Sequence, residues 1–526
     1  MDKNPPPAGL TGDQLMLAFS GYKPPEHILH WLSARPLGGF TLFRKLNVDS
    51  AAQLRRLTAS LQEAAARARR PPLLIAADQE GGQLIGLGEE TTPFPGNMAL
   101  GATGDGALAR RVGLALGSEL AALGVNLNYA PVCDVNSNPL NPNVGVRAFG
   151  DDPTLVAELA AAMIEGLQSA GVAATAKHFP GNGESGLDPH YGVPVVPQDR
   201  RELDEGALRP FRAAIAAGAK LIMSAHVALP ALTGRSDLPA TVQRAIMHDL
   251  LRQELGFEGV IITDAMDMGA ISQGAGQIVD AIAALRAGVD LLLLTDDPEG
   301  QERLYHGLEL ALSRRLLDQV AVDTSVQRVR ALRRWLTGWP QPPLEVVGCA
   351  EHRLLAREVA EKALTLVRDD GLLPLRLGSE ERVAAVMPQP EDLTPADTSS
   401  YVTPCLAQAM RRYHRHVDEF IVAQAPGDND IAALRERLGD YDLIILVTLS
   451  ASLQPAQAVL ARELLALGRP TVTVAARTPY DILAYPAART HLCTYSIQPP
   501  SLEALASALW GQIPTPGRLP VHLPQP

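Results

Sequence analysis

The stretch VAATAKHFPGNGESGLDPHYGVPVV, residues 172–196, opens as an apolar run and continues as a loop rich in glycine and proline. The run ends at Lys177 and His178, and the loop carries Asp188 and His190. Glycine and proline keep a backbone irregular and at the surface, and reactive side chains concentrate on such loops. The stretch therefore predicts a buried strand that leads into a reactive loop, with a solvated polar connection as the alternative.

Apolar runs of the same kind recur between residues 15 and 294, with helical patterns between them. Most are apolar throughout instead of alternating with polar residues, which is typical of strands covered on both faces in a parallel sheet. Several helical patterns end at a glycine just before the next run, where helices commonly terminate. The eight runs are Leu15–Phe19, Phe40–Phe43, Leu73–Ala77, Val125–Val132, Val172–Lys177, Leu221–Ala225, Val260–Thr263 and Val289–Leu294.

Eight strands that alternate with helices predict an α/β fold that opens with a (β/α)8 TIM-like barrel over residues 1–345. An open doubly wound sheet is the competing arrangement, although no GxGxxG motif follows the first run. Pro340, Pro342 and Pro343 then interrupt the helical pattern and indicate a linker.

Residues 346–526 show a second alternation of helices and strands, so we expect a smaller C-terminal α/β sandwich domain there. The pattern predicts that this part begins with a helix over residues 352–367, and it contains no obvious catalytic cluster. The strands predicted after that helix cover residues 382–387, 418–423, 441–449, 470–476 and 491–496.

The barrel prediction also locates the chemistry, because the active sites of TIM barrels lie at the carboxyl ends of the strands. Polar or ionisable side chains follow most of the eight runs, whereas the runs themselves carry almost none. This placement favours an active site at the mouth of the barrel. The side chains in question are Asp78, Asp134, Lys177 with His178, His226, Asp264, and Thr295 with Asp296.

Composition limits the classes of partner. The chain has 526 residues, a formal net charge of −12 and no long basic run, which argues against nucleic acid or an anionic membrane. Its four cysteines form no CxxC pair, so we expect neither a zinc site nor a disulfide framework. No apolar run reaches the roughly 18 residues of a membrane span or opens the chain as a signal peptide would. We expect a cytoplasmic protein, and its oligomeric state stays open.

Glycoside hydrolysis requires two opposed groups, one to attack or stabilise the anomeric carbon and one to protonate the leaving oxygen. Asp264 at a strand end has the rigid position that suits a nucleophile. His190 lies on a glycine-rich loop and can move in as a general acid and base, since histidine titrates near neutral pH. Asp188, two residues away, would orient the imidazole and raise its proton affinity.

Longer motifs carry a resemblance to a known family. The loop reads KHFPGNG from Lys177, DPH follows at Asp188–His190, and the strand end at Asp264 reads ITDAMDM. Further motifs are ADQEGGQ, FPGNMALGA, NYAPVCDVNSNPLNPNVGVRAFGDDP, SAHVALPAL and GRLPVHLP. Together they resemble glycoside hydrolase family 3, in particular its bacterial β-N-acetylglucosaminidase branch, over nearly the whole chain.

The resemblance implies a retaining, exo-acting β-N-acetylglucosaminidase that needs no cofactor and no metal and acts on a small carbohydrate, in peptidoglycan recycling. By the same resemblance, Asp264 would form the glycosyl-enzyme ester, and His190 assisted by Asp188 would act as acid and base. The substrate-binding residues that it implies are Asp78, Arg147, Lys177, His178 and His226.

Three positions depart from the family pattern. Asn182 stands where a second histidine is usual, and an amide can hydrogen-bond but carries no charge. Pro189 occupies the middle of the dyad, where serine or threonine is usual, and biases Asp188 toward an extended backbone. No arginine follows DQEGG, since the chain continues as GGQLIGLG, and the preference for N-acetylglucosamine over glucose therefore stays open.

Four alternatives remain open from the sequence. The same fold would support a retaining β-glucosidase, or a β-glycoside phosphorylase in which phosphate replaces water. The absent arginine also allows a sugar-binding homologue without catalysis. A metal-dependent hydrolase is disfavoured because no HxH follows the first run and Lys177 would place a cation beside the metal. The ligands of that metal would be His178, His190, His226 and Asp264.

Overall fold

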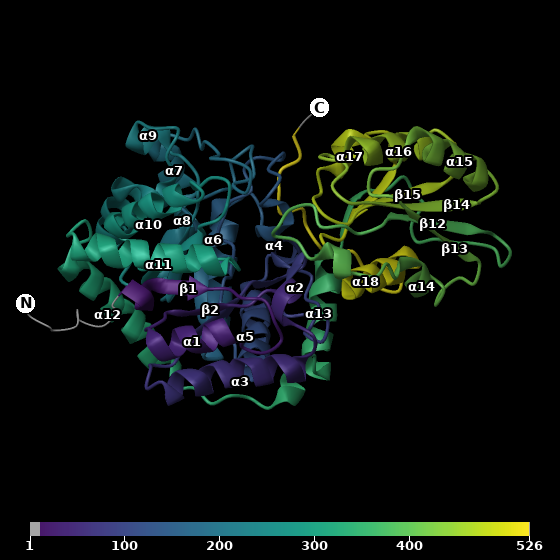
Figure 1. The fold of residues 1–526 in the computed structure, drawn as a ribbon. Coiled ribbons are helices and arrows are strands. Elements are labelled where there is room, and N and C mark those ends of the chain that lie inside the picture. Colours follow the sequence, from purple (N-terminus) through teal and green to yellow (C-terminus); the bar gives the residue numbers. More distant parts are fainter. Residues whose placement is uncertain (1–10, 525–526) are drawn as a thin grey trace, which may run out of the picture.

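Eight parallel strands close into a barrel in the computed structural model, which describes residues 11–524 (Figure 1). Each strand overlaps one of the eight predicted runs, so the barrel prediction is confirmed and the open doubly wound alternative is wrong. The order around the barrel is β1-β10-β9-β8-β7-β6-β3-β2, and β1 pairs with β2 to close it. The strands are β1 (Leu15–Leu17), β2 (Gly39–Thr41), β3 (Leu74–Ala77), β6 (Leu127–Asn128), β7 (Ala173–Phe179), β8 (Leu221–Ser224), β9 (Val260–Ala265) and β10 (Leu291–Leu294).

Side chains along each strand point alternately into the barrel and outward to the helices. In β9, Ile262 belongs to the apolar cluster inside the barrel, while its neighbour Ile261 packs with the helices outside. Met16, Leu74 and Leu127 also fill the interior. Both faces are therefore apolar, which explains the uninterrupted runs, and a ligand site has to lie at an end of the barrel.

Helices cover the outside of the barrel (Figure 1). Several begin at a side chain that accepts from the first turn, as Ser50, Asp105 and Asp152 do. None of the helices within residues 11–524 combines the length and the apolar character that crossing a membrane requires. The helices are α1 (Glu26–Ala34), α2 (Arg44–Asn47), α3 (Ala51–Arg67), α4 (Asn97–Thr103), α5 (Gly106–Ala122), α6 (Pro153–Ser169), α7 (Arg200–Glu205), α8 (Leu208–Ala216), α9 (Pro230–Thr233), a π-helix (Ala245–Glu254), α10 (Ala275–Ala287), α11 (Pro298–Ser313) and α12 (Gln319–Leu336).

A six-stranded sheet lies beside the barrel, in the order β11-β16-β15-β14-β12-β13. Neighbouring strands are parallel except at the edge, where β11 runs antiparallel to β16. Figure 1 shows α14 and α18 on one face and α15, α16 and α17 on the other, so the α/β sandwich is confirmed. Its elements are β11 (Thr365–Arg368), β12 (Val383–Pro388), α14 (Leu406–Met410), β13 (Val417–Val422), α15 (Asp428–Leu438), β14 (Leu443–Thr448), α16 (Pro455–Leu465), β15 (Thr471–Ala475), α17 (Asp481–Ala484), β16 (Thr490–Cys493) and α18 (Pro499–Leu509).

The helix predicted over residues 352–367 is wrong at its C-terminal end. Helix α13 spans Ala350–Ala363, and the next residues form β11 instead of another helical turn. Thr365 pairs there with Cys493 of β16. β-branched residues such as Thr365 and Val367 favour an extended backbone, so sheet pairing outweighs the helical periodicity that precedes it.

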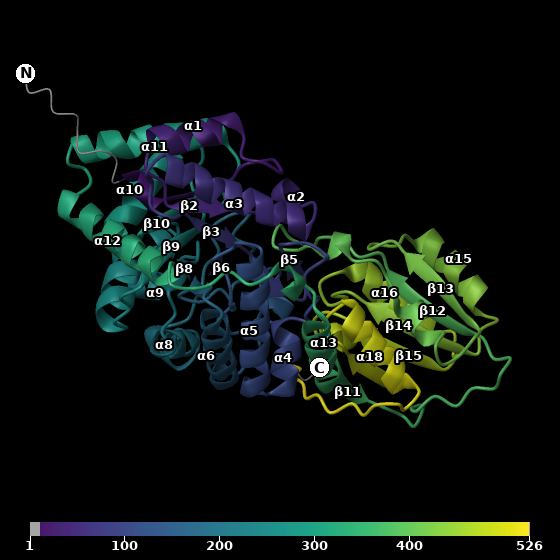
Figure 2. The ribbon, with the colours of Figure 1, turned by 90° about the horizontal axis from the view of Figure 1, so that it is seen from below.

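The barrel and the second sheet unit contact each other through several segments. Helix α13 packs against α4 of the barrel and α18 of the sheet unit (Figure 2). The hairpin of β4 (Gln79–Gly81) and β5 (Leu84–Ile85) follows β3, and in its turn the Gln83 carbonyl accepts from the Thr398 N–H at 2.8 Å. The boundary predicted between residues 345 and 346 stays a prediction, because α13 follows it and yet joins the apolar cluster of the barrel.

Candidate active site

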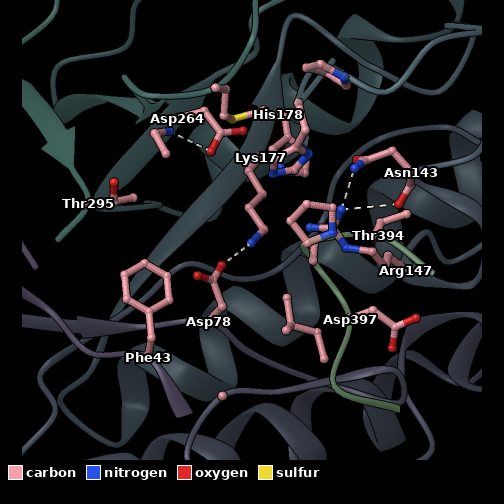
Figure 3. A pocket seen from close by; sticks show the side chains of 18 of the residues that line it. Phe43, Asp78, Asn143, Arg147, Lys177, His178, Asp264, Thr295, Thr394 and Asp397 are labelled. Carbon is pink, nitrogen blue, oxygen red and sulfur yellow. Dashed lines mark hydrogen bonds and ion pairs between the residues drawn. The ribbon is translucent and has the colours of Figure 1, made fainter. Parts of the chain in front are cut away.

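A cavity of about 630 Å³ opens at the carboxyl ends of the barrel strands, and residues of the second sheet unit form part of its lining (Figure 3). Seven of the eight predicted site residues line this one cavity, although the chain brings them from six separate segments. The eighth, Asp188, is buried behind His190. The seven are Asp78, Arg147, Lys177, His178, His190, His226 and Asp264.

A buried chain of alternating charges lies along the cavity. The Lys177 Nζ atom, at the end of β7, is 2.6 Å from Asp78 Oδ1 and 2.7 Å from Glu80 Oε1. Arg147 donates two hydrogen bonds to the same Glu80 carboxylate, from Nη2 at 2.8 Å and from Nε at 3.0 Å. The side chains of Lys177, Glu80 and Arg147 are at most 4% exposed, whereas Asp78 is 25% exposed toward the cavity.

Pairing outweighs the cost of burying these charges. Burial would raise the pKa of Glu80, but Arg147 and Lys177 lower it from the ordinary 4.5 to about 2. Burial would likewise lower the pKa of Lys177, but Asp78 and Glu80 hold it above its ordinary value. Glu80, Lys177 and Arg147 are therefore charged at neutral pH, and the cavity presents the fixed Lys177 ammonium beside the carboxyl group of Asp78, which suits the hydroxyl groups of a sugar.

Asp264 lies near the end of β9 and is partly exposed to the cavity. Its Oδ1 accepts from the Ala265 N–H at 2.8 Å. Burial would raise the pKa of Asp264, but His178 and the Ala265 N–H outweigh burial and hold the pKa below its ordinary value. The carboxylate is thus ionised at neutral pH, which is the state that nucleophilic attack requires.

His178 is held by a buried carboxylate next to the cavity. Its Nδ1 lies 2.7 Å from Asp134 Oδ2, and Asp134 also accepts from the Asn182 N–H at 2.7 Å. Asp134 is fully buried, and its carboxylate contacts the end of β7 and the loop that follows it. With Nδ1 committed in this way, Nε2 is the ring nitrogen of His178 that remains for a ligand.

His226 has both ring nitrogens committed to the protein. Nδ1 lies 2.7 Å from the Thr241 hydroxyl, and Nε2 lies 3.2 Å from the Ala265 carbonyl. This network assigns the Nε2–H tautomer, and burial lowers the pKa of His226, so the ring is neutral. The ring therefore holds the backbone beside Asp264, and a hydrogen bond to a sugar would have to replace one of these contacts.

The predicted dyad is assembled on the loop after β7. His190 Nδ1 lies 2.6 Å from Asp188 Oδ1, and the His190 N–H donates to the same oxygen at 3.0 Å. Burial would lower the pKa of His190, but the Asp188 carboxylate outweighs burial and raises the pKa above its ordinary value. Nε2 is then the ring atom available to a substrate, and the imidazole is 24% exposed on the cavity side.

The dyad loop is fastened to the loop that follows Asp264. The Gly269 N–H donates to the His190 carbonyl and the Ala270 N–H to the Pro189 carbonyl, both at 3.1 Å. A Cβ on Gly269 would lie 2.5 Å from the His190 carbonyl oxygen, so this close approach requires glycine. The backbone thereby places the candidate nucleophile and the candidate acid in one cavity.

Sequence reasoning missed the contribution of the second sheet unit, in which no catalytic cluster was apparent. Residues 392–401, the segment that follows β12, supply seven residues of the cavity lining. Asp397 folds this segment by accepting from the N–H groups of Leu393 and Ser399 at 3.0 and 2.9 Å, and it pairs with buried Arg477. A cluster of proline, aspartate, serine and threonine directly after an apolar strand was the available signal.

Two further charged or polar groups were also missed within the barrel. Glu80 lies in the DQEGG stretch, two residues after Asp78, and Asn143 lies four residues before Arg147. Nothing in the sequence showed that Glu80 pairs with groups far along the chain. Within residues 11–524, no three His, Cys, Asp or Glu side chains are arranged to hold a metal ion.

Comparison with known proteins finds a matching family model, related sequences and a similar solved structure. Residues 11–332 match the family model described as "Glycosyl hydrolase family 3 N terminal domain". The chain is 33% identical to β-hexosaminidase A of Pseudoalteromonas piscicida, over 97% of this chain and 96% of that protein. It is 30% identical to a β-N-acetylglucosaminidase/β-glucosidase of Cellulomonas fimi, with 97% and 92% covered. A solved glycoside hydrolase family 3 β-N-acetylglucosaminidase from Paenibacillus sp. superposes with a TM-score of 0.93 at 36% identity, with 98% of each chain covered.

Replacing Glu80 by glutamine should lower the free energy of unfolding by about 3–5 kcal/mol, because Lys177 and Arg147 then stay buried without their shared countercharge. Glu63→Gln is the matched control, since Glu63 pairs with Arg67 on an exposed helix face and such pairs contribute about 0–1 kcal/mol. Chemical denaturation of the three proteins measures both losses, and equal losses for the two variants would contradict the assignment.

The depressed pKa of Glu80 also fixes the sign of a pH effect. The stabilisation is complete above the unfolded value of 4.5 and is lost as the pH falls toward about 2. The stability difference between the wild type and Glu80→Gln should therefore stay constant near neutral pH and shrink below pH 4.5. A difference that grows with acidification would contradict the buried pairing.

Proposed function

Since the chain belongs to glycoside hydrolase family 3 and is a glycoside hydrolase, we propose that it is an exo-acting, retaining β-N-acetylglucosaminidase. Its substrate would be a small carbohydrate that ends in β-linked N-acetylglucosamine. The observation that carries the proposal is the pairing, in one cavity, of an ionised Asp264 with a His190 whose protonated form is stabilised. The β-N-acetylglucosaminidases among the relatives support the sugar.

In the first step, the Asp264 carboxylate attacks the anomeric carbon and the bond to the leaving oxygen breaks. His190 donates its Nε2 proton to that oxygen, so the aglycone departs as a neutral alcohol and the imidazole becomes neutral. In the second step, His190 takes a proton from water, the water oxygen attacks the anomeric carbon, and the ester to Asp264 breaks. Two displacements return the sugar with its β configuration.

Asp188 contributes to both steps by stabilising the protonated imidazole of His190. Its carboxylate stabilises the imidazolium, so His190 starts the first step protonated and can recover a proton in the second. An acid on a loop suits this alternation, because it has to reach the glycosidic oxygen in one step and a water molecule in the next.

The buried charge chain would hold the sugar. Asp78 and Lys177 face the cavity as acceptor and donor for ring hydroxyls, and His178 offers Nε2. Arg147 lines the cavity but has Glu80 as its main partner. For His226 we propose a positioning role at the Ala265 carbonyl, since neither ring nitrogen is free.

A β-glucosidase remains the second candidate, because no arginine follows DQEGG and the Cellulomonas fimi relative carries both activities in its name. A phosphorylase would use the same first step and accept phosphate in the second.

A panel of p-nitrophenyl β-glycosides, assayed with and without inorganic phosphate, separates the three activities. We expect the N-acetylglucosaminide to be cleaved faster than the glucoside, with free N-acetylglucosamine as the product in both buffers. A glucoside cleaved equally well, or release of the sugar 1-phosphate, would contradict the proposed specificity or the proposed acceptor.

Asp264→Ala should reduce turnover by roughly 10⁴-fold or more, because the covalent nucleophile is removed. The fold should survive, since Asp264 stands at the edge of the cavity and, within residues 11–524, its carboxylate forms no hydrogen bond except that with its neighbour's N–H. Steady-state rates and the thermal midpoint measure the two effects. A variant that keeps a tenth of the wild-type rate would exclude Asp264 from this role.

His190→Ala should slow an alkyl or sugar aglycone by roughly 10²–10⁴-fold, but should slow the first step with a dinitrophenyl glycoside far less. A dinitrophenolate departs without a proton, whereas an alcohol needs one. Asp188→Ala should follow the same trend with a smaller loss, because the imidazole remains but is less basic. The dependence of kcat/KM on leaving-group pKa measures both, and an equal slowing of all substrates would rule out His190 as the acid.

A further inference from the structure

We propose that Asn143 is a positioning residue that orients the acid/base dyad and couples it to the buried ion pair behind the sugar subsite. The inference rests on the proposed function, because it assigns the acid to His190 and Asp188. It deepens that function by naming the contact through which occupation of the sugar subsite reaches the general acid.

The carboxamide of Asn143 contacts a charged group with each of its two sides, Asp188 with one and Arg147 with the other. Figure 3 shows the contact with Arg147. Its Nδ2 donates to Asp188 Oδ1 at 3.1 Å, and its Oδ1 accepts from Arg147 Nη1 at 3.0 Å. The backbone carbonyl of Asn143 accepts from the same Nη1 at 3.2 Å. A carboxamide has one donor side and one acceptor side, so only one orientation of Asn143 satisfies both partners.

Each end of this link is fixed by other contacts. Arg147 is held by two bonds to Glu80, which in turn is held by Lys177. Asn143 itself is 5% exposed, and its N–H donates at 2.9 Å to Asn141 Oδ1, which also accepts from the next residue of the turn. A rigid sequence of contacts therefore leads from the sugar subsite to the Asp188 carboxylate.

The dyad needs such a link, because it lies on a loop. The Gly269 and Ala270 N–H groups hold the loop's backbone but do not touch the Asp188 carboxylate. Asp188 Oδ1 accepts from His190 and from Asn143, and among the described residues Asp188 Oδ2 is buried without a hydrogen-bond partner. Asn143 is thus the side chain that ties this carboxylate to the body of the barrel.

The charged groups that face His190 determine how a substitution at Asn143 would change the pKa of the imidazole. Asp188 and Arg147 lie on the Asn143 side. Asp264 from β9 and the neutral His226, which follows β8, face His190 across the cavity. Asn143→Asp keeps the acceptor for Arg147 but replaces the donor to Asp188 with a negative charge. That charge favours the imidazolium, so His190 should stay protonated to a higher pH.

The test compares Asn143→Asp and Asn143→Leu with matched changes at Asn136, another buried asparagine of the same loop, whose amide donates to Tyr480 instead of the dyad. The readouts are the pH profile of kcat/KM and the rates with an alkyl and a dinitrophenyl glycoside. We expect the alkaline limb of Asn143→Asp to move to higher pH by about half a unit or more. Both Asn143 variants should lose about tenfold or more with the alkyl glycoside and less than about threefold with the dinitrophenyl glycoside.

The Asn136 variants should leave the alkaline limb and the leaving-group dependence in place. An alkaline limb of Asn143→Asp that coincides with the wild type, or an equal loss on both substrates, would overturn the inference. Asn143→Asp is nearly isosteric, so it remains informative if Asn143→Leu fails to fold. A failure of the proposed function would give a different result. The wild-type pH profile would then have no alkaline limb that depends on His190, that is, none that is lost in His190→Ala.

Discussion

The carboxylate of Glu80, buried between Lys177 and Arg147, is the interaction on which the cavity depends. Two cations at this depth repel each other and lose their hydration, and a shared carboxylate offsets both costs only when the geometry is close. The three side chains come from the hairpin after β3, the end of β7 and the turn that contains Arg147. Their pairing therefore fixes the relative positions of these three segments, and the proposed sugar-binding groups and the proposed dyad stand at the two sides of that junction.

The barrel carries the proposed nucleophile on a rigid strand and the proposed acid on a loop that other residues hold in place. Asp264 is carried by β9, whose side chains pack on both faces, so its position is set by the core. His190 is carried by a loop that is held by two backbone bonds and by Asn143. A nucleophile has to be in the same place in both steps, whereas an acid that becomes a base has to serve two oxygen atoms in turn. The two modes of attachment match these two requirements.

Much of this arrangement could be predicted from local patterns, and the part that could not is long-range. The apolar runs and the polar residues that follow them locate Asp78, Lys177, His226 and Asp264, because strand ends in a parallel barrel share one face. The role of Glu80 depends on partners from two other segments, and no spacing in the sequence predicts which residues they are. Periodicity also could not show that both nitrogens of His226 are committed or that residues 392–401 close one side of the cavity. At β11, pairing with β16 decided against the helical pattern.

We propose that Asp264 forms a covalent bond to the sugar while the rest of the cavity holds Asp264 and the acid in place. An activated 5-fluoro derivative of N-acetyl-β-glucosamine tests it most directly, because the fluorine slows hydrolysis of the intermediate and lets it accumulate. Mass spectrometry of the digested protein then locates the sugar. We expect one sugar per chain, on the peptide that contains Asp264, and no labelling of Asp264→Ala. A sugar on another carboxylate, or turnover without any covalent species, would contradict it.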